Sequence, residues 1–121
     1  MKLVIFGLTI SSSWGNGHAT VWRGLCRELA HLGHQIIFFE KNVAYYAAHR
    51  DFHDIPGGKL ILYDTWTDAF SRALQHLADA EVAIVTSYCP DGIAAAELVS
   101  ASRPLKVFYD LDTPVTLSQI E

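Results

Sequence analysis

Five short apolar runs constrain the fold of this chain more than any other feature of its sequence. None of the runs alternates between apolar and polar residues, and all are rich in β-branched and aromatic side chains. Such runs are typical of strands that are covered on both faces, as the strands of parallel sheets are. The sequence therefore predicts five parallel strands, at residues 2–6, 35–40, 59–63, 82–86 and 105–109.

Apolar residues recur at helical spacing between these runs. The first helix is predicted to end at Gly33, because glycine suits a left-handed C-cap. Its apolar stripe consists of Trp22, Leu25, Cys26 and Leu29. Further helices are predicted over residues 67–78 and 91–101, and a short helix is expected within residues 42–58. The apolar stripe of the 67–78 helix consists of Phe70, Ala73, Leu74 and Leu77.

The alternation of strands and helices predicts an α/β fold. We expect a Rossmann-like, doubly wound parallel sheet with strand order 3-2-1-4-5 and helices on both faces, formed by residues 1–121 as a single domain. In such sheets the ligand crevice lies beyond the carboxyl ends of the strands, where strands 1 and 4 diverge. The connections that reach this edge span residues 7–18, 40–42, 87–92 and 110–113.

Charge and composition disfavour several classes of protein. Thirteen acidic and nine basic residues give a net charge of -4, which does not indicate the basic surface that nucleic-acid binding requires. The opening apolar run is too short for a membrane span and lacks the pattern of a signal peptide, so we expect a cytoplasmic protein. Cys26 and Cys89 are predicted to be free thiols, and neither they nor the six histidines show the spacing of a metal site.

The connection after the first strand, "GLTISSSWGNGHAT" from Gly7 to Thr20, is the main candidate for function. It opens a helix, where unpaired backbone N–H groups and the positive end of the dipole favour a phosphate, a carboxylate or a hydroxyl-rich ligand. The alternative is that it only supplies a turn and a polar cap. Connections of this type commonly take about 2–6 residues, so its length favours function. The predicted substrate-binding residues here are Ser13, Gly15, Asn16 and Gly17, with Ser11 and Ser12 as further donors.

The sequence does not predict a cofactor. The dinucleotide fingerprint G-x-G-x-x-G is absent after the first strand, and no Gly-Lys-Ser/Thr of a phosphate-binding loop occurs. Glu40 ends the second strand, where dehydrogenases place a ribose-binding acid, but it is equally suited to be a solvated charge at the strand end. A nicotinamide or flavin enzyme therefore remains only a less favoured alternative.

Two residues at this edge are candidates for direct chemistry. His18 is suited to be a general base for an acceptor hydroxyl, since imidazole titrates near neutral pH, or to cap the turn before the helix. Asp91 is predicted either to bind substrate or to be the N-cap of the 91–101 helix. Cys89 is expected to be a small packed residue in preference to a nucleophile.

Two further groups of residues leave alternatives open. Asp110, Asp112 and Thr113 follow the last strand and are suited to bind an acceptor or a metal-bridged diphosphate, or only to form the turn before Pro114. Trp14 and the Tyr45-Tyr46 pair are suited to stack on a sugar ring, although aromatic residues more often pack in cores.

The sequence resembles a known family in three stretches that together cover most of the chain. These are residues 1–51, "VTSYCPDG" at residues 85–92 and "FYDLDTPVTL" at residues 108–117. They look like the N-terminal part of CgeB-like glycosyltransferases, the spore-maturation type, which have the two-domain GT-B architecture. The resemblance implies a transferase that uses a nucleotide sugar, with its N-terminal domain receiving the acceptor and its C-terminal domain binding the donor.

The extent of the chain departs from that pattern, since GT-B enzymes have two Rossmann-like domains and this sequence stops at Glu121. We therefore expect that the C-terminal donor domain is absent, that this chain alone transfers no sugar, and that it self-associates through the exposed edge of its last strand. The nucleotide sugar and the acceptor would be partners of the full-length parent. The alternative is a non-catalytic Rossmann-type module for nucleotide binding or protein interaction.

Overall fold

The computed structural model describes residues 1–14 and 17–109. Its strands form one five-stranded sheet in the order β3-β2-β1-β4-β5, and every neighbouring pair of strands is parallel. The predicted Rossmann-like α/β fold and its strand order are confirmed. The strands are β1 (Lys2–Gly7), β2 (Gln35–Lys41), β3 (Lys59–Tyr63), β4 (Val82–Thr86) and β5 (Leu105–Tyr109).

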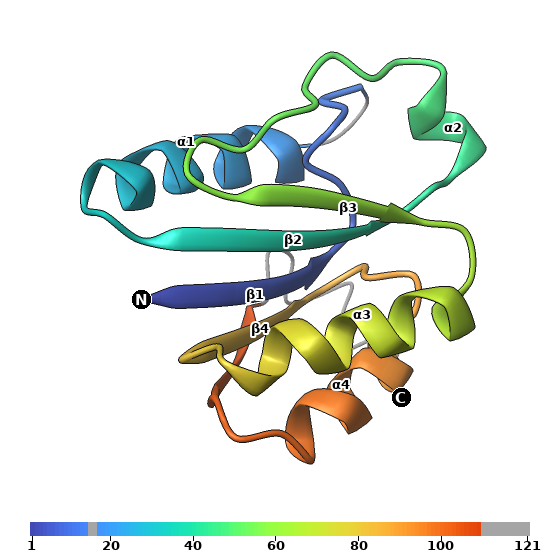
Figure 1. Cartoon of the computed structure of the whole chain (residues 1–121). Coiled ribbons are helices and arrows are strands. Elements are labelled where there is room, and N and C mark those ends of the chain that lie inside the picture. The colour runs from blue at the N-terminus through green and yellow to red at the C-terminus, as the bar shows by residue number, and fades with distance from the viewer. Residues whose placement is uncertain (15–16, 110–121) are drawn as a thin grey trace.

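Helices cover both faces of the sheet. They are α1 (His18–His31), α2 (Ala44–Ala47), α3 (Trp66–Ala78) and α4 (Gly92–Ser100). Figure 1 shows α1 on one face of the sheet and α3 and α4 on the other, as right-handed crossovers require. The chain leaves α1 as predicted, because Gly33 has a φ of 85° and its N–H donates to the carbonyl of Ala30 at 3.0 Å. None of the helices in the described part of the chain is long and apolar enough to cross a membrane.

Each face of the sheet has its own apolar core. Val4 and Phe6 of β1 pack with buried residues of α3 and α4, whereas Leu3 and Ile5 pack with Trp22 of α1. Complete burial of such side chains stabilises the fold by about 1.5–3 kcal/mol each. Because both faces of the central strands are buried, their sequences are continuously apolar and do not alternate.

The apolar stripe predicted for α3 is partly wrong. Ala69, Ala73 and Leu77 are the buried residues of this helix, whereas Phe70 is 42% exposed and Leu74 is 47% exposed. Small alanine side chains let the helix approach the sheet closely, so the larger residues lie at the flank of the contact.

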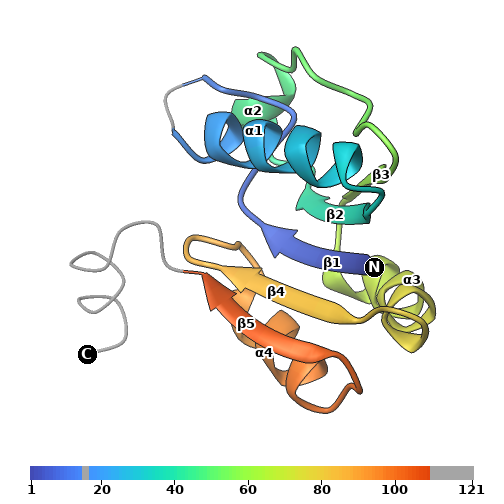
Figure 2. The ribbon, with the colours of Figure 1, turned by 90° about the vertical axis from the view of Figure 1, so that its left-hand side faces the viewer.

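The strand β5 forms one margin of the sheet (Figure 2). It pairs with β4 in a register that places Leu105 beside Val82 and Tyr109 beside Thr86. All five residues of β5 are exposed, and Leu105 and Phe108 are the most exposed, at 67% and 61%. In the part of the chain that the structure describes, no strand pairs with the outer edge of β5. Self-association through this edge remains a prediction.

Candidate functional site

The loops that follow β1 and β4 meet at the carboxyl edge of the sheet. His18, the first residue of α1, is half-buried there, and its ring lies edge-on to the ring of Tyr88, with centroids 5.6 Å apart and an interplanar angle of 82°. Tyr88 has a φ of 64°, a left-handed conformation that costs a residue with a side chain about 1–3 kcal/mol. Strain of this kind is common at functional sites, and here it occurs at the residue that faces His18.

The first turn of α1 opens into this crevice without a side-chain cap. Gly17 occupies the N-cap position, so His18 lies within the helix and is not its cap. A β-carbon added to Gly17 would meet nothing within 4 Å, and no acidic residue lies in the first turn. The backbone N–H groups at this helix start are suited to a negatively polarised ligand group.

A buried carboxylate holds the loop between β1 and α1. Glu40 is fully buried, and its Oε1 accepts hydrogen bonds from the backbone N–H of Ile10 at 2.8 Å and of Ser11 at 3.0 Å. Its Oε2 accepts from the Ser11 hydroxyl at 2.6 Å. The alternative that Glu40 is a solvated charge is therefore wrong, because three donors of the loop replace water around it. With both oxygens bound to the loop, Glu40 is also poorly suited to bind a ribose.

Two arginines extend this network. Arg50 lies 3.8 Å from Oε2 of Glu40, and it donates to the Ser11 hydroxyl at 3.0 Å and to the side-chain oxygen of Asn42 at 2.9 Å. Arg23 of α1 donates to the carbonyl of Ile10 at 2.9 Å and pairs with Asp51. The hydrogen bond from Arg23 lowers the pKa of Asp51.

The segment around Asp51 also contacts the loop through its backbone. The N–H groups of Asp51 and Phe52 both donate to the carbonyl of Ser11, at 2.9 and 3.1 Å. Ile10 and Ser11 of the loop are therefore bonded to β2, to α1 and to the chain that follows α2.

Two serines of the loop do not have the role predicted for them, which was to donate hydrogen bonds to a ligand. Ser11 and Ser12 are fully buried, and Ser12 accepts a hydrogen bond from the backbone N–H of Trp14 at 3.2 Å. These two side chains stabilise the loop and face inward, whereas Ser13 is exposed. Five predicted binding residues lie outside the described residues: Gly15, Asn16, Asp110, Asp112 and Thr113.

Asp91 occupies the N-cap position of α4, as predicted, but its side chain makes no cap hydrogen bond. Its carboxylate instead accepts a hydrogen bond from the hydroxyl of Tyr63 at 3.1 Å and lies 3.6 Å from the ammonium of Lys41. Burial, together with repulsion from the ionised forms of Cys89 and Asp91, raises the pKa of Tyr63, so this phenol stays protonated and donates. Asp91 thus links the carboxyl ends of β2 and β3 to the start of α4.

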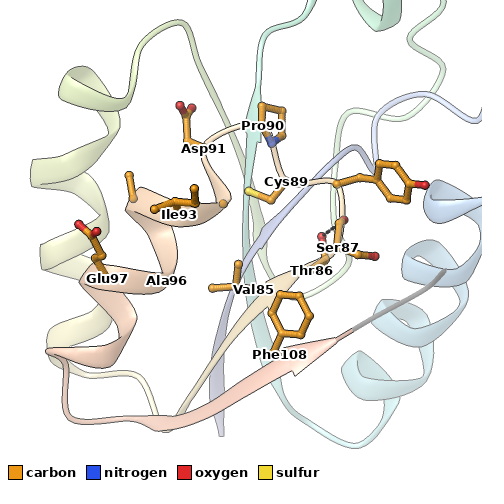
Figure 3. A pocket seen from close by; sticks show the side chains of 13 residues that line it. Val85, Thr86, Ser87, Cys89, Pro90, Asp91, Ile93, Ala96, Glu97 and Phe108 are labelled. Carbon is orange, nitrogen blue, oxygen red and sulfur yellow. Dashed lines mark hydrogen bonds between the residues drawn. The ribbon is translucent and has the colours of Figure 1, made fainter. Parts of the chain in front are cut away.

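A cavity of about 670 Å³ lies between the loop after β4, the start of α4 and β5 (Figure 3). Its wall includes Thr86, Cys89, Ile93 and Phe108. Burial raises the pKa of the Cys89 thiol to about 12. The thiol is therefore protonated near neutral pH and unsuited to be a nucleophile, in agreement with its expected packing role.

Exposed aromatic rings lie at the same edge of the sheet. Trp14 and His49 stack face to face, with centroids 4.1 Å apart and an interplanar angle of 10°. Tyr45 lies edge-on to His49, with centroids 6.5 Å apart, and edge-on to Tyr46, at 5.1 Å. Trp14 is 52% exposed and Tyr45 is 55% exposed, so neither packs in the core. We call Trp14, Tyr45 and His49 the aromatic shelf.

Within residues 1–14 and 17–109, no group of three or more His, Cys, Asp or Glu side chains is arranged to hold a metal ion. Comparison of the chain with models of known families, with curated proteins and with solved structures finds no match.

Proposed function

We propose that this chain is the acceptor-side domain of a glycosyltransferase that uses a nucleotide sugar, with His18 as its general base. The observation that carries the proposal is the position of His18 in the first turn of α1, opposite the strained Tyr88. The carboxyl edge of a doubly wound sheet is where such folds bind ligands. The resemblance to CgeB-like glycosyltransferases, carried by residues 1–51, 85–92 and 108–117, supports the same assignment.

The proposed chemistry needs one proton acceptor at the crevice. His18 takes the proton from an acceptor hydroxyl while the oxygen forms a bond to the anomeric carbon of the donor sugar. The bond between that carbon and the diphosphate oxygen breaks, and the nucleoside diphosphate leaves with the electron pair. The half-buried position of His18 keeps the imidazole accessible to the acceptor while it limits competing water.

The loop network supports this role by fixing Ile10 and Ser11 in the connection between β1 and α1. Glu40 and Arg50 hold Ser11, and Arg23 joins α1 to the carbonyl of Ile10. A general base must be held within hydrogen-bond reach of its substrate, and a fixed loop contributes that geometry. The two cysteines, Cys26 and Cys89, are free thiols, which fits a cytoplasmic enzyme.

One observation favours a second candidate, a non-catalytic interaction module. Apolar side chains of β5 and α4 are exposed next to each other, with Phe108 at 61% and Ile93 at 82% exposure. Exposed apolar patches commonly mark protein interfaces. An interaction module does not require His18, so the two candidates differ in the effect of removing this side chain.

Two assays test the proposal. In the protein that contains this chain, release of nucleoside diphosphate from a panel of nucleotide sugars with pooled acceptors should depend on His18. For residues 1–121 alone, calorimetry should show only weak binding of the same nucleotide sugars, because the donor contacts are assigned to another domain. Micromolar or tighter binding by this chain would contradict the acceptor-side assignment.

A further inference from the structure

We propose that the aromatic shelf of Trp14, Tyr45 and His49 binds a neutral sugar ring by stacking. The inference rests on the proposed function only in assigning that ring to the acceptor, since the binding surface itself stands on its own geometry. A sugar ring has an apolar face of C–H groups, which packs against aromatic rings. A stacking site for such a ring needs exposed aromatic surface, a fixed orientation and polar groups beside it.

The shelf has exposed aromatic surface in a defined arrangement. The rings of Trp14 and His49 are stacked and nearly parallel, and about half of the surface of Trp14 and Tyr45 is accessible to solvent. The edge-on contact of Tyr45 with His49 sets this tyrosine at an angle to the stacked pair. The stacked pair and Tyr45 thus present aromatic surfaces in two orientations. One is suited to the face of a bound sugar ring and the other to its edge.

The shelf is also preformed, although its rings come from segments far apart in the sequence. The backbone N–H of Trp14 is bonded to Ser12, which is fully buried in the loop after β1. His49 directly precedes Arg50, whose guanidinium is bonded to Ser11 and Asn42. Figure 1 shows the loop after β1 beside α2 and the chain that follows it. Because both segments are anchored, little entropy is lost when the rings bind a ligand.

The charges next to the shelf favour a neutral sugar over a nucleotide. Arg50 is engaged by Ser11, Asn42 and Glu40, and Arg23 is paired with Asp51. A phosphate would have to displace one of these partners to gain a charged contact. The amide of Asn42 accepts a hydrogen bond from Arg50 and donates one to Asp64, and its second N–H and second lone pair are suited to sugar hydroxyls.

The shelf is close enough to His18 for one acceptor to contact both. Trp14 precedes His18 by four residues. Four residues span at most about 14 Å even when fully extended. A short oligosaccharide is therefore long enough to place one ring on the shelf and a hydroxyl of another ring at the imidazole.

Nuclear magnetic resonance of residues 1–121 tests the shelf directly, because the chain has three tryptophans and hence three indole N–H signals. Trp22 is fully buried and Trp66 packs against the opposite core, so their signals are internal controls. The Trp14→Phe variant identifies the Trp14 signal. The probes are cellobiose, maltose and diacetylchitobiose, with adenosine monophosphate and uridine monophosphate as nucleotide probes.

The expected result is that at least one disaccharide shifts the Trp14 signal but not those of Trp22 and Trp66, with a Kd on the order of 1 mM. Read from the backbone amide signals of Tyr45 and His49, Trp14→Ala should weaken this binding about tenfold or more, whereas Trp14→Phe should retain part of it. Phe108→Ala is the matched control, because it removes an equally exposed ring from β5. Circular dichroism of each variant confirms that the fold is kept.

Three outcomes would overturn the inference: no shift with any disaccharide, a shift of Trp14 with the nucleotides alone, or equal loss of binding in Phe108→Ala. The sugar-binding proposal and the proposed function can each be refuted without the other. Sugar binding by the shelf without a turnover effect of His18→Ala would leave a glycan-binding surface on a non-catalytic domain. Turnover that depends on His18 without sugar binding by Trp14 would keep the transferase and remove the shelf.

Discussion

The carboxylate of Glu40 accepts two hydrogen bonds from Ser11, one from its backbone N–H at 3.0 Å and one from its hydroxyl at 2.6 Å. Both residues are fully buried, although Ser11 belongs to the loop after β1 and Glu40 to β2. The conformation of the loop at Ile10 and Ser11 is therefore determined by the neighbouring strand.

Replacement of Glu40 by glutamine should destabilise the chain. The amide oxygen of Glu40→Gln accepts hydrogen bonds at one position only, so at least one buried donor of Ile10 or Ser11 is left without its acceptor. The expected loss in the free energy of unfolding is about 1–3 kcal/mol. Urea denaturation measures it, with Glu28→Gln on the exposed side of α1 as the control, for which a change within about 0.5 kcal/mol is expected. Equal stability of the two variants would show that the Glu40 contacts make no net contribution to the free energy of unfolding.

Gly7→Ala should also destabilise the fold, through overpacking. A β-carbon at Gly7 would lie 2.6 Å from Cζ of Phe38 and 3.3 Å from Oγ1 of Thr86. Forcing a methyl group into such a contact costs about 1–3 kcal/mol. Gly24→Ala in α1 is the matched control, because its β-carbon meets nothing within 4 Å and alanine should stabilise the helix by up to about 1 kcal/mol. A Gly7→Ala variant as stable as the parent would mean that Phe38 moves aside freely.

Buried Cys26 and half-buried Cys89 should make the chain less stable at alkaline pH. Burial raises the pKa of Cys26 to about 11 and that of Cys89 to about 12, from 9.0. Above pH 9 the unfolded chain releases these protons while the folded chain retains them, so stability is complete below pH 9 and falls as the pH rises toward 11 and 12.

Unfolding curves between pH 8 and pH 10.5 of the parent and of Cys89→Ala measure this effect, and the slope should be smaller in the variant. At pH 8 iodoacetamide should modify both thiols slowly in the folded chain and rapidly in urea. Rapid modification of folded Cys89 would contradict its protonated, enclosed state.

The edge of β5 should cause self-association. Leu105 and Phe108 are exposed on a strand whose outer edge has no partner in the described part of the chain. Light scattering should show a mass that rises with protein concentration, and Phe108→Lys should reduce this rise because a charge at an open edge opposes pairing. A monodisperse monomer at high concentration would refute the prediction.

The fold was predictable from sequence because its signals are local. The five apolar runs and Gly33 depend on neighbours a few residues away, and the structure places each where the pattern predicts. The buried face of α3 was harder to predict, since periodicity alone does not show whether Phe70 or Ala69 faces the sheet. That choice depends on how closely the helix packs.

The site was only partly predictable. The sequence indicated the edge where His18 and Asp91 lie, but the bonds of Glu40 to Ser11 join residues 29 apart and leave no spacing to detect. One signal existed: Glu40 continues an apolar run, and a carboxylate in a buried strand requires hydrogen-bond donors. No such signal marked His49, because its stacking on Trp14 follows from the folded chain alone.

The most direct test of the central claim is turnover by the His18→Ala variant of the protein that contains this chain. If His18 is the general base, nucleoside diphosphate release in the presence of acceptor should fall by about 10²- to 10⁴-fold. The melting temperature should stay nearly unchanged, because His18 is only half-buried and belongs to neither apolar core. His31→Ala, at the exposed end of the same helix, is the control and should retain full turnover. A His18→Ala variant with unchanged turnover would contradict the proposed function.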